Sequence, residues 1–287
     1  MSLVKILVLA VVQGAAELLP VSSSAHVIVA EKLMGLDPTA PEMTLLLVML
    51  HTGTMFAVIF YFWGSWRTGY FSSRERFLSA AKLIAAATFF TGVVGLVLKA
   101  LIEKVALRGT PHAQVELIFG NVPLIAASLF AVGLLIVYSG GRDGRAGQAD
   151  PDLRGASLIG LIQGVCLPFR GFSRSGATIS AGLMQGISRK SAEEFSFALA
   201  VVLTPPVIAR EVWRLLKAHA VSPPHAAFSA ALFLPGLLAM VFSFISGILA
   251  LKWLSNWMEK GRWRLFGYYC LSASLLLLIF NEAGLLK

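Results

Sequence analysis

Residues 12–26 read VQGAAELLPVSSSAH and residues 162–178 read IQGVCLPFRGFSRSGAT, so a polar element occurs twice in a largely apolar chain. Both copies begin with Gln-Gly and end in clustered hydroxyl residues. Their glutamines, Gln13 and Gln163, lie 150 positions apart in 287 residues. Polar groups at membrane depth are costly and are usually functional. The repetition therefore predicts a site that each half of the chain builds in part.

The composition is that of an integral membrane protein. Hydrophobic residues make up 57% of the chain and charged residues 14%, and the mean hydropathy is +0.77. A soluble domain is only about half apolar and about a quarter charged. The Lys and Arg residues behind the net charge of +9 are scattered between apolar runs, a pattern that indicates membrane anchoring rather than a nucleic-acid partner. We expect a single membrane domain over residues 1–287.

Six apolar stretches are long enough for spans of about 20 residues. They are Met43 to Trp63, Leu78 to Leu101, Leu117 to Tyr138, Phe195 to Leu216, Ala227 to Leu251 and Trp263 to Phe280. Two pseudo-repeats, residues 1–140 and 150–287, each begin with a weaker region, residues 3–35 and 153–188, which the polar element interrupts. About ten apolar residues on each side of a break are too few for a span, so these regions predict re-entrant helical hairpins.

The predicted fold is therefore an all-α polytopic membrane protein with six transmembrane helices and two re-entrant helical hairpins. Three crossings in each half make the second half run opposite to the first, which is an inverted-topology repeat of the kind found in transporters. With this topology 12 Lys and Arg residues fall on one side and 9 on the other. The positive-inside rule then places the richer side in the cytoplasm and both termini outside.

The first polar element carries the residues for proton and phosphate chemistry. These are Gln13, Glu17, Ser22, Ser23, Ser24 and His26. Gln13 and Glu17 are four positions apart and share one helix face. Pro20 then breaks the helix, and the serines can present hydroxyls where the next helix starts. A carboxylate, hydroxyls and an imidazole suit a phosphate ester; the alternative is helix capping by Ser22 with Glu17 bonded to a neighbouring helix.

The second polar element resembles a phosphate-binding helix start. Gly171 permits a tight turn, and the residues that follow are Ser173, Arg174, Ser175, Gly176 and Thr178. Helix N-terminal N–H groups, hydroxyls and a guanidinium suit a tetrahedral oxyanion. Arg174 at membrane depth needs an anionic partner. That partner is either a bound phosphate or Glu17, and a purely structural Arg174–Glu17 bridge is the alternative reading.

At these residues the chain closely resembles the undecaprenyl-diphosphate phosphatase family, also called bacitracin-resistance proteins. Residues 13–26 are similar to the family's first motif: Gln or Glu, three residues, Glu, then Pro-Val-Ser-Ser and a histidine. Residues 171–178 are similar to its second motif, Pro-Gly-x-Ser-Arg-Ser-Gly-x-Thr, and the resemblance covers nearly the whole chain. One departure is Arg170, which stands where the family usually has proline.

The resemblance implies hydrolysis of undecaprenyl diphosphate to undecaprenyl phosphate and inorganic phosphate, at the outer face of the bacterial inner membrane. This reaction recycles the lipid carrier of cell-wall synthesis and confers bacitracin resistance. The resemblance also implies a divalent cation, Mg²⁺ or Ca²⁺. The expected partners are the lipid diphosphate, membrane lipids and a second copy of the chain in a homodimer.

Residue roles follow from both lines of reasoning. We expect catalysis by Glu17, Ser23, His26 and Arg174, phosphate binding by Ser22, Ser173, Arg174, Ser175, Gly176 and Thr178, and metal binding by Glu17 and Gln13. Either Ser23 attacks phosphorus while His26 or Glu17 takes its proton, or one of these two activates a water directly. A polyprenyl-phosphate flippase with the same cleft is the competing class, and phosphate release by the purified protein distinguishes the two.

Overall fold

The computed structural model describes residues 2–36, 41–109, 114–142, 149–221 and 230–286. Within these ranges the chain is helical and forms no strand. The helices are α1 (Leu3–Leu18), α2 (Ser23–Leu33), α3 (Pro41–Gly69), α4 (Arg74–Leu101), η1 (Ile102–Ala106), η2 (Val115–Ile118), α5 (Val122–Arg142), α6 (Leu153–Cys166), α7 (Arg174–Met184), α8 (Arg189–Val221), α9 (Ala230–Glu259) and α10 (Trp263–Glu282). The junction of the pseudo-repeats includes residues 143–148, which lie outside the described residues.

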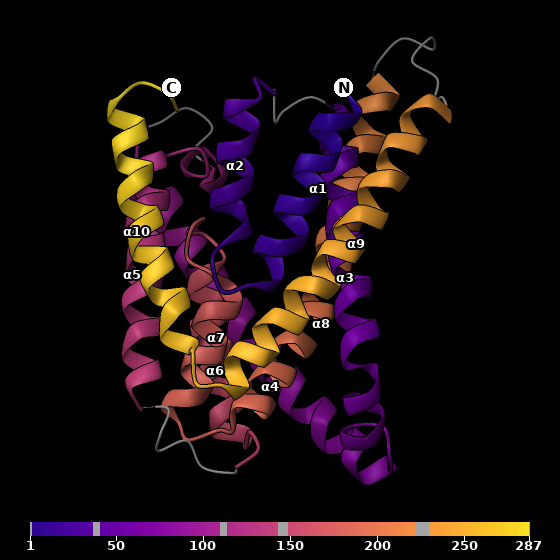
Figure 1. The fold of residues 1–287 in the computed structure, drawn as a ribbon, viewed down its shortest axis with the longest axis vertical. Coiled ribbons are helices and arrows are strands. Elements are labelled where there is room, and N and C mark those ends of the chain that lie inside the picture. Colours follow the sequence, from indigo (N-terminus) through magenta and orange to yellow (C-terminus); the bar gives the residue numbers. More distant parts are fainter. Residues whose placement is uncertain (1, 37–40, 110–113, 143–148, 222–229, 287) are drawn as a thin grey trace.

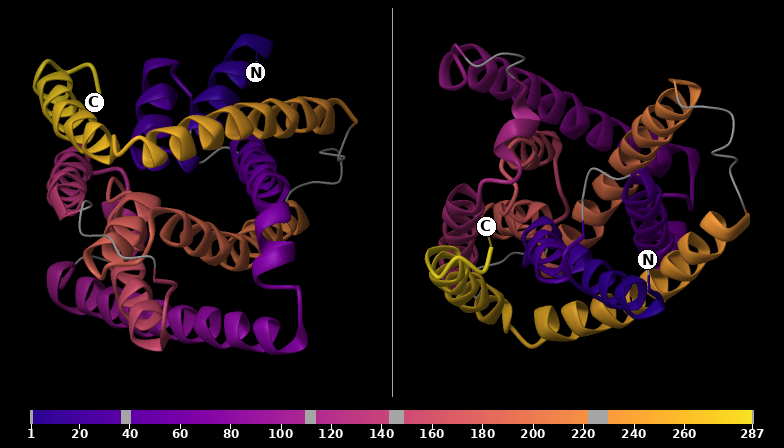
Figure 2. Two further views of the ribbon diagram at one scale, coloured as in Figure 1. Left: turned by 60° about the horizontal axis from the view of Figure 1, so that its bottom comes forward. Right: turned by 90° about the horizontal axis from the view of Figure 1, so that it is seen from above.

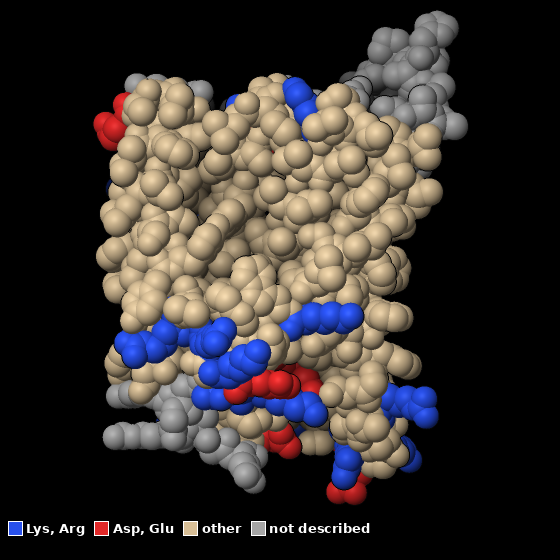
Figure 3. Space-filling view, viewed as in Figure 1, with Lys and Arg blue, Asp and Glu red and all other residues tan. Residues whose placement is uncertain are grey.

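Among the described residues, six helices are long and apolar enough to cross a membrane, which confirms that prediction. The apolar segments are Met43–Gly69, Arg74–Ala106, Val122–Gly141, Arg189–Trp213, Leu234–Glu259 and Trp263–Glu282. Charged side chains gather at the end of the molecule opposite the two termini, whereas the broad middle of the face in Figure 3 is uncharged. An uncharged band between charged ends is the surface that a bilayer requires.

Some predicted helix boundaries are wrong. The span expected from Leu117 begins instead at Val122, because Val115–Ile118 forms a separate 3₁₀ helix. The side chain of Asn121 then accepts the N–H of Leu124 at 3.0 Å and starts α5. Helix α8 begins at Arg189, before the predicted Phe195. The predicted start at Ala227 lies outside the described residues.

Each interrupted region forms two short helices joined by a turn. In Figure 1, α1 runs from the end that holds both termini toward the centre, and α2 returns to that end; α6 and α7 make the same excursion from the opposite end. The two turns meet inside the molecule, where the Ser175 hydroxyl donates to the Leu19 carbonyl at 3.3 Å. The polar elements of the two halves are thereby brought together.

The glycine of each Gln-Gly pair permits a close helix contact. A Cβ on Gly14 would lie 2.6 Å from the carbonyl oxygen of Ser243 in α9. A Cβ on Gly164 would lie 2.6 Å from the Cβ of Val94 in α4. Small residues at such positions allow helix backbones to approach closely in a membrane. These glycines therefore set how α1 and α6, the first helix of each pair, pack against a long helix.

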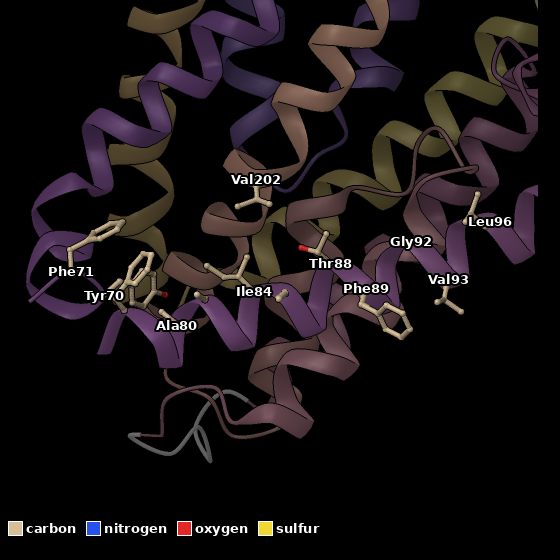
Figure 4. A pocket seen from close by; sticks show the side chains of 13 residues that line it. Tyr70, Phe71, Ala80, Ile84, Thr88, Phe89, Gly92, Val93, Leu96 and Val202 are labelled. Carbon is tan, nitrogen blue, oxygen red and sulfur yellow. The ribbon is translucent and has the colours of Figure 1, made fainter. Parts of the chain in front are cut away.

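Helix α4 is the most peripheral of the long helices. Only 11% of its apolar window is buried, against 33–50% for the other five candidate spans, and Figure 2 shows it along one side of the molecule. An apolar groove of about 810 Å³ follows it from Phe71 to Leu96, with Val202 of α8 on the other wall (Figure 4). Lipid tails are as apolar as these side chains, so this face is suited to contact with lipid.

Candidate active site

A cavity of about 670 Å³ collects polar residues of both repeated elements. The predicted site residues that line it are Gln13, Glu17, Ser22, Ser23, Ser173, Arg174 and Ser175. His26, Gly176 and Thr178 are not among the described residues of its wall. The structure thus brings most of the predicted residues around one space, whereas the other three do not line it.

An unusual backbone conformation positions Ser23 in the wall of the cavity. Helix α1 ends at Leu18, and α2 begins at Ser23 after a short turn. Within that turn Ser22 has φ 68° and ψ 96° and is the only residue other than glycine with positive φ in the described chain. Such a conformation costs on the order of 1–3 kcal/mol and persists only where neighbouring contacts enforce it. The turn directs the Ser23 hydroxyl toward Glu17.

Glu17 connects the two polar elements. Its Oε2 atom accepts hydrogen bonds from the Ser23 hydroxyl and, at 3.2 Å, from Nε2 of Gln13. Its Oε1 atom lies 3.4 Å from Nη2 of Arg174, and both side chains are 21% exposed. A carboxylate bonded to a serine hydroxyl is placed to take the serine's proton. The contact with Arg174 places a cation on the other oxygen of the same carboxylate.

The second element is held as a rigid helix start. Ser173 caps α7 by accepting the N–H of Gly176 at 3.2 Å. The Thr178 hydroxyl donates to the Arg174 carbonyl at 2.8 Å and lies 2.6 Å from the Ser196 hydroxyl of α8. Before the helix, Gly171 has φ +104°, and an added Cβ would lie 2.3 Å from the Ile125 carbonyl oxygen. Only glycine fits this turn, so the turn and the cap together fix Arg174.

The histidine of the first element bonds away from the Ser23–Glu17 pair. His26 Nδ1 lies 2.8 Å from the Ser22 carbonyl oxygen, and Nε2 lies 2.6 Å from the hydroxyl of Tyr269 in α10. The His26 and Tyr269 rings stack with centroids 5.7 Å apart. Sequence reasoning missed Tyr269, because it lies in an apolar span that carries no motif.

The two repeated glutamines have different surroundings. Gln13 reaches Glu17 in the cavity, whereas Gln163 donates to the Thr91 hydroxyl of α4 at 3.0 Å. The Oε1 atom of Gln163 is buried and has no hydrogen-bond partner in the described chain. The second copy of the Gln-Gly pair therefore belongs to a helix interface, and the repeat has diverged in use.

Arg170 and Glu31 also line the cavity. The guanidinium carbon of Arg170 lies 4.4 Å from the centre of the Phe119 ring. Glu31, which the sequence analysis did not select, is 4% exposed, and its Oε1 atom is buried without a hydrogen-bond partner in the described chain. Burial raises the pKa of Glu31, and the charge of Arg170 opposes that shift. This part of the wall adds a cation and a carboxyl group.

The family model described as "Bacitracin resistance protein BacA" matches residues 6–276 of this chain. The chain belongs to this family. It is 58% identical over 275 residues to "Undecaprenyl-diphosphatase 2" of Acinetobacter baylyi, covering 96% of each chain. It is 33% identical over 282 residues to "Undecaprenyl-diphosphatase" of Korarchaeum cryptofilum, covering 97% of this chain and 99% of the relative. It is also 35% identical over 292 residues to "Undecaprenyl-diphosphatase 1" of Burkholderia pseudomallei, covering 96% and 95%.

The metal-binding atoms near Glu17 are too few to coordinate a metal ion on their own, but they fit a site in which the protein supplies some of the ligands and a phosphate supplies others. Among the described residues, no three His, Cys, Asp or Glu side chains come together as a metal-binding group. Gln13 and Glu17 offer one amide oxygen and one carboxylate. Mg²⁺ is commonly held by one or two carboxylates together with substrate phosphates and water. These two residues therefore fit a cation that arrives with, or is completed by, a phosphate ligand.

Proposed function

We propose that this protein hydrolyses undecaprenyl diphosphate to undecaprenyl phosphate and inorganic phosphate, and so confers bacitracin resistance by recycling the lipid carrier of cell-wall synthesis. Membership of the BacA family and the names of the three relatives support this assignment. The observation that carries it is the contact of Ser23 with Glu17 beside Arg174, in a cavity that both polar elements line.

In the mechanism that this geometry favours, the Ser23 hydroxyl oxygen attacks the terminal phosphorus. The bond from phosphorus to the bridging oxygen breaks, undecaprenyl phosphate leaves with the electron pair, and the serine proton passes to Glu17. Water then attacks the phosphoserine, which restores the Ser23 hydroxyl and releases phosphate. Direct activation of water by Glu17 is the second route, but the Ser23–Glu17 hydrogen bond supports the first.

Charge neutralisation is the other requirement, because phosphoryl transfer depends mainly on positioning and electrostatics. We assign Arg174 to the transferred phosphoryl group, with the hydroxyls of Ser173 and Ser175 beside it. Gly176 and Thr178 support this group from behind by fixing the start of α7. A divalent cation, Mg²⁺ or Ca²⁺, held by Glu17 and Gln13 would supply further neutralisation of the diphosphate charge.

We also propose that α1–α2 and α6–α7 are re-entrant hairpins of an inverted-topology repeat over residues 1–140 and 150–287 of one membrane domain. Two short helices followed by three long ones occur in each half, and the short pairs enter from opposite ends. The positive-inside count then favours a location in the bacterial inner membrane, with the termini and the cavity mouth at the outer face. A homodimer stays a prediction, which light scattering of the detergent-solubilised protein would test.

Phosphate release by the purified protein tests the function. Wild-type protein with Mg²⁺ should release phosphate from undecaprenyl diphosphate, and Ser23→Ala should not. Ser157→Ala is the matched control, because among the described residues the Ser157 hydroxyl bonds only the Leu153 carbonyl of its own helix, at 2.7 Å. Headgroup translocation in liposomes without phosphate release would favour the flippase. Normal turnover by Ser23→Ala would eliminate the serine route.

A further inference from the structure

Two consecutive hydrogen bonds link the last helix of the protein to the turn that carries Ser23. The Tyr269 hydroxyl of α10 lies 2.6 Å from His26 Nε2, and His26 Nδ1 lies 2.8 Å from the Ser22 carbonyl oxygen. The ring planes of His26 and Tyr269 are inclined by only 13°. Tyr269 belongs to neither polar element and is 243 positions away in the sequence. This series of hydrogen bonds ends at Ser22, one residue before Ser23, the proposed nucleophile.

The partners determine which nitrogen of His26 carries the proton. A backbone carbonyl can only accept, so Nδ1 must be the donor to Ser22. In the neutral ring Nε2 is then an acceptor, and the Tyr269 hydroxyl is its donor. Burial lowers the pKa of His26, although the bond to Ser22 opposes this shift. Both ring nitrogens are therefore occupied by bonds that do not involve Ser23.

These bonds hold a strained peptide. Ser22 has φ 68°, and its own side chain makes no cap hydrogen bond at the start of α2. Its carbonyl instead receives both the Nδ1–H and, at 3.4 Å, the backbone N–H of His26. Because Ser22 directly precedes Ser23, its backbone angles set the direction of the Ser23 side chain. A rotation of this peptide would move the hydroxyl away from Glu17.

We propose that His26 and Tyr269 are positioning residues that together hold the Ser22 peptide and thereby aim the Ser23 hydroxyl at the terminal phosphate. This inference rests on the phosphatase function proposed above. It assigns to Tyr269 a part in the reaction that neither motif contains. It also means that His26 takes no part in proton transfer, because Glu17 accepts the proton of Ser23.

Two substitutions of His26 distinguish positioning from acid–base catalysis. His26→Asn keeps a donor at the place of Nδ1 but has no ionisable group and loses the Tyr269 bond, so kcat should stay within about tenfold of wild type. His26→Leu removes the donor, and kcat should fall about 100-fold with KM little changed, since small misplacements of a reacting group cost about that much. Equal loss of kcat in both variants, with both folded, would overturn the proposal.

Tyr269 is tested in the same phosphate-release assay. Tyr269→Phe keeps the ring stack and loses one hydrogen bond, so kcat should fall about three- to tenfold. The neighbouring Tyr268→Phe is the control and should leave kcat unchanged. In the His26→Asn background, Tyr269→Phe should change kcat less than twofold, because asparagine offers no counterpart of Nε2. Equal effects of Tyr269→Phe in both backgrounds would contradict this series of hydrogen bonds.

A spectroscopic measurement is independent of turnover. Nuclear magnetic resonance of protein with ¹⁵N-labelled histidine should show one ring, absent from His26→Asn, that is protonated at Nδ1 and unprotonated at Nε2. A proton on Nε2 would overturn the proposal even if the enzyme is fully active. If the wild-type protein releases no phosphate, the proposed function is wrong. The tautomer of the His26 ring would still show whether the hydrogen bonds from Tyr269 to Ser22 exist.

Discussion

Replacing Glu17 by glutamine separates its chemical role from its structural one. The Glu17 carboxylate accepts hydrogen bonds from Ser23 and Gln13 and forms an ion pair with Arg174. Loss of a proton acceptor costs roughly 10²- to 10⁴-fold in rate, which corresponds to about 3–5 kcal/mol of barrier. The ion pair with Arg174 is 21% exposed on each side, so its loss should cost about 1–3 kcal/mol, between the surface and buried limits.

The two magnitudes predict an enzyme that is folded but inactive. A protein stable by about 5–15 kcal/mol remains mostly folded after such a loss, so kcat should fall at least about 100-fold while the gel-filtration profile and helical circular dichroism persist. Glu193→Gln is the matched control: like Glu17, Glu193 accepts a hydrogen bond from a serine hydroxyl, that of Ser255 at 2.6 Å, but it is more deeply buried and lies outside the cavity wall. Phosphate release by Glu17→Gln within tenfold of wild type would refute the reasoning.

Four further results are expected. Arg174→Ala should abolish phosphate release yet elute as folded protein, and turnover near wild type would remove Arg174 from the site. Arg170→Gln should raise KM about tenfold through loss of a charged hydrogen bond, whereas an unchanged KM would leave Arg170 without a substrate contact. Gly164→Val should lower the melting temperature through overpacking against Val94 worth about 1–3 kcal/mol, and an unchanged melting temperature would contradict the close contact. Chelation with EDTA should stop turnover until Mg²⁺ or Ca²⁺ is added, and full activity in EDTA would exclude the cation.

The long apolar stretches of the chain were sufficient to predict the six long helices, because each helix needs a run of apolar residues that a membrane can accept. The prediction failed at Leu117, where residues Val115–Ile118 form a separate 3₁₀ helix and a side-chain cap at Asn121 sets the real start of α5. Hydropathy carries no information about such a cap. Boundaries set by local hydrogen bonds were therefore the weakest part of the prediction.

The site was predictable as an inventory but not as a set of partners. Glu17, Ser23 and Arg174 could be selected because polar residues in apolar sequence demand an explanation, and the structure places them together. The direction of His26 toward Tyr269 depends on how α10 packs, and nothing in the sequence pairs these two residues. The different hydrogen-bond partners of Gln13 and Gln163 likewise arise from helix packing rather than from the motif that the two residues share.

The ion pair between Glu17 and Arg174 also makes substrate binding an exchange reaction. The Glu17 carboxylate of α1 pairs with the Arg174 guanidinium, which would otherwise face the cavity as an uncompensated charge. An incoming phosphate must compete with this internal anion for Arg174, while the Ser23 hydroxyl stays bonded to the other oxygen of Glu17. Affinity for the lipid headgroup is consequently lower than an unoccupied Arg174 would give. In return, the cationic site keeps its shape between turnovers and discriminates against weak anions, which cannot displace Glu17.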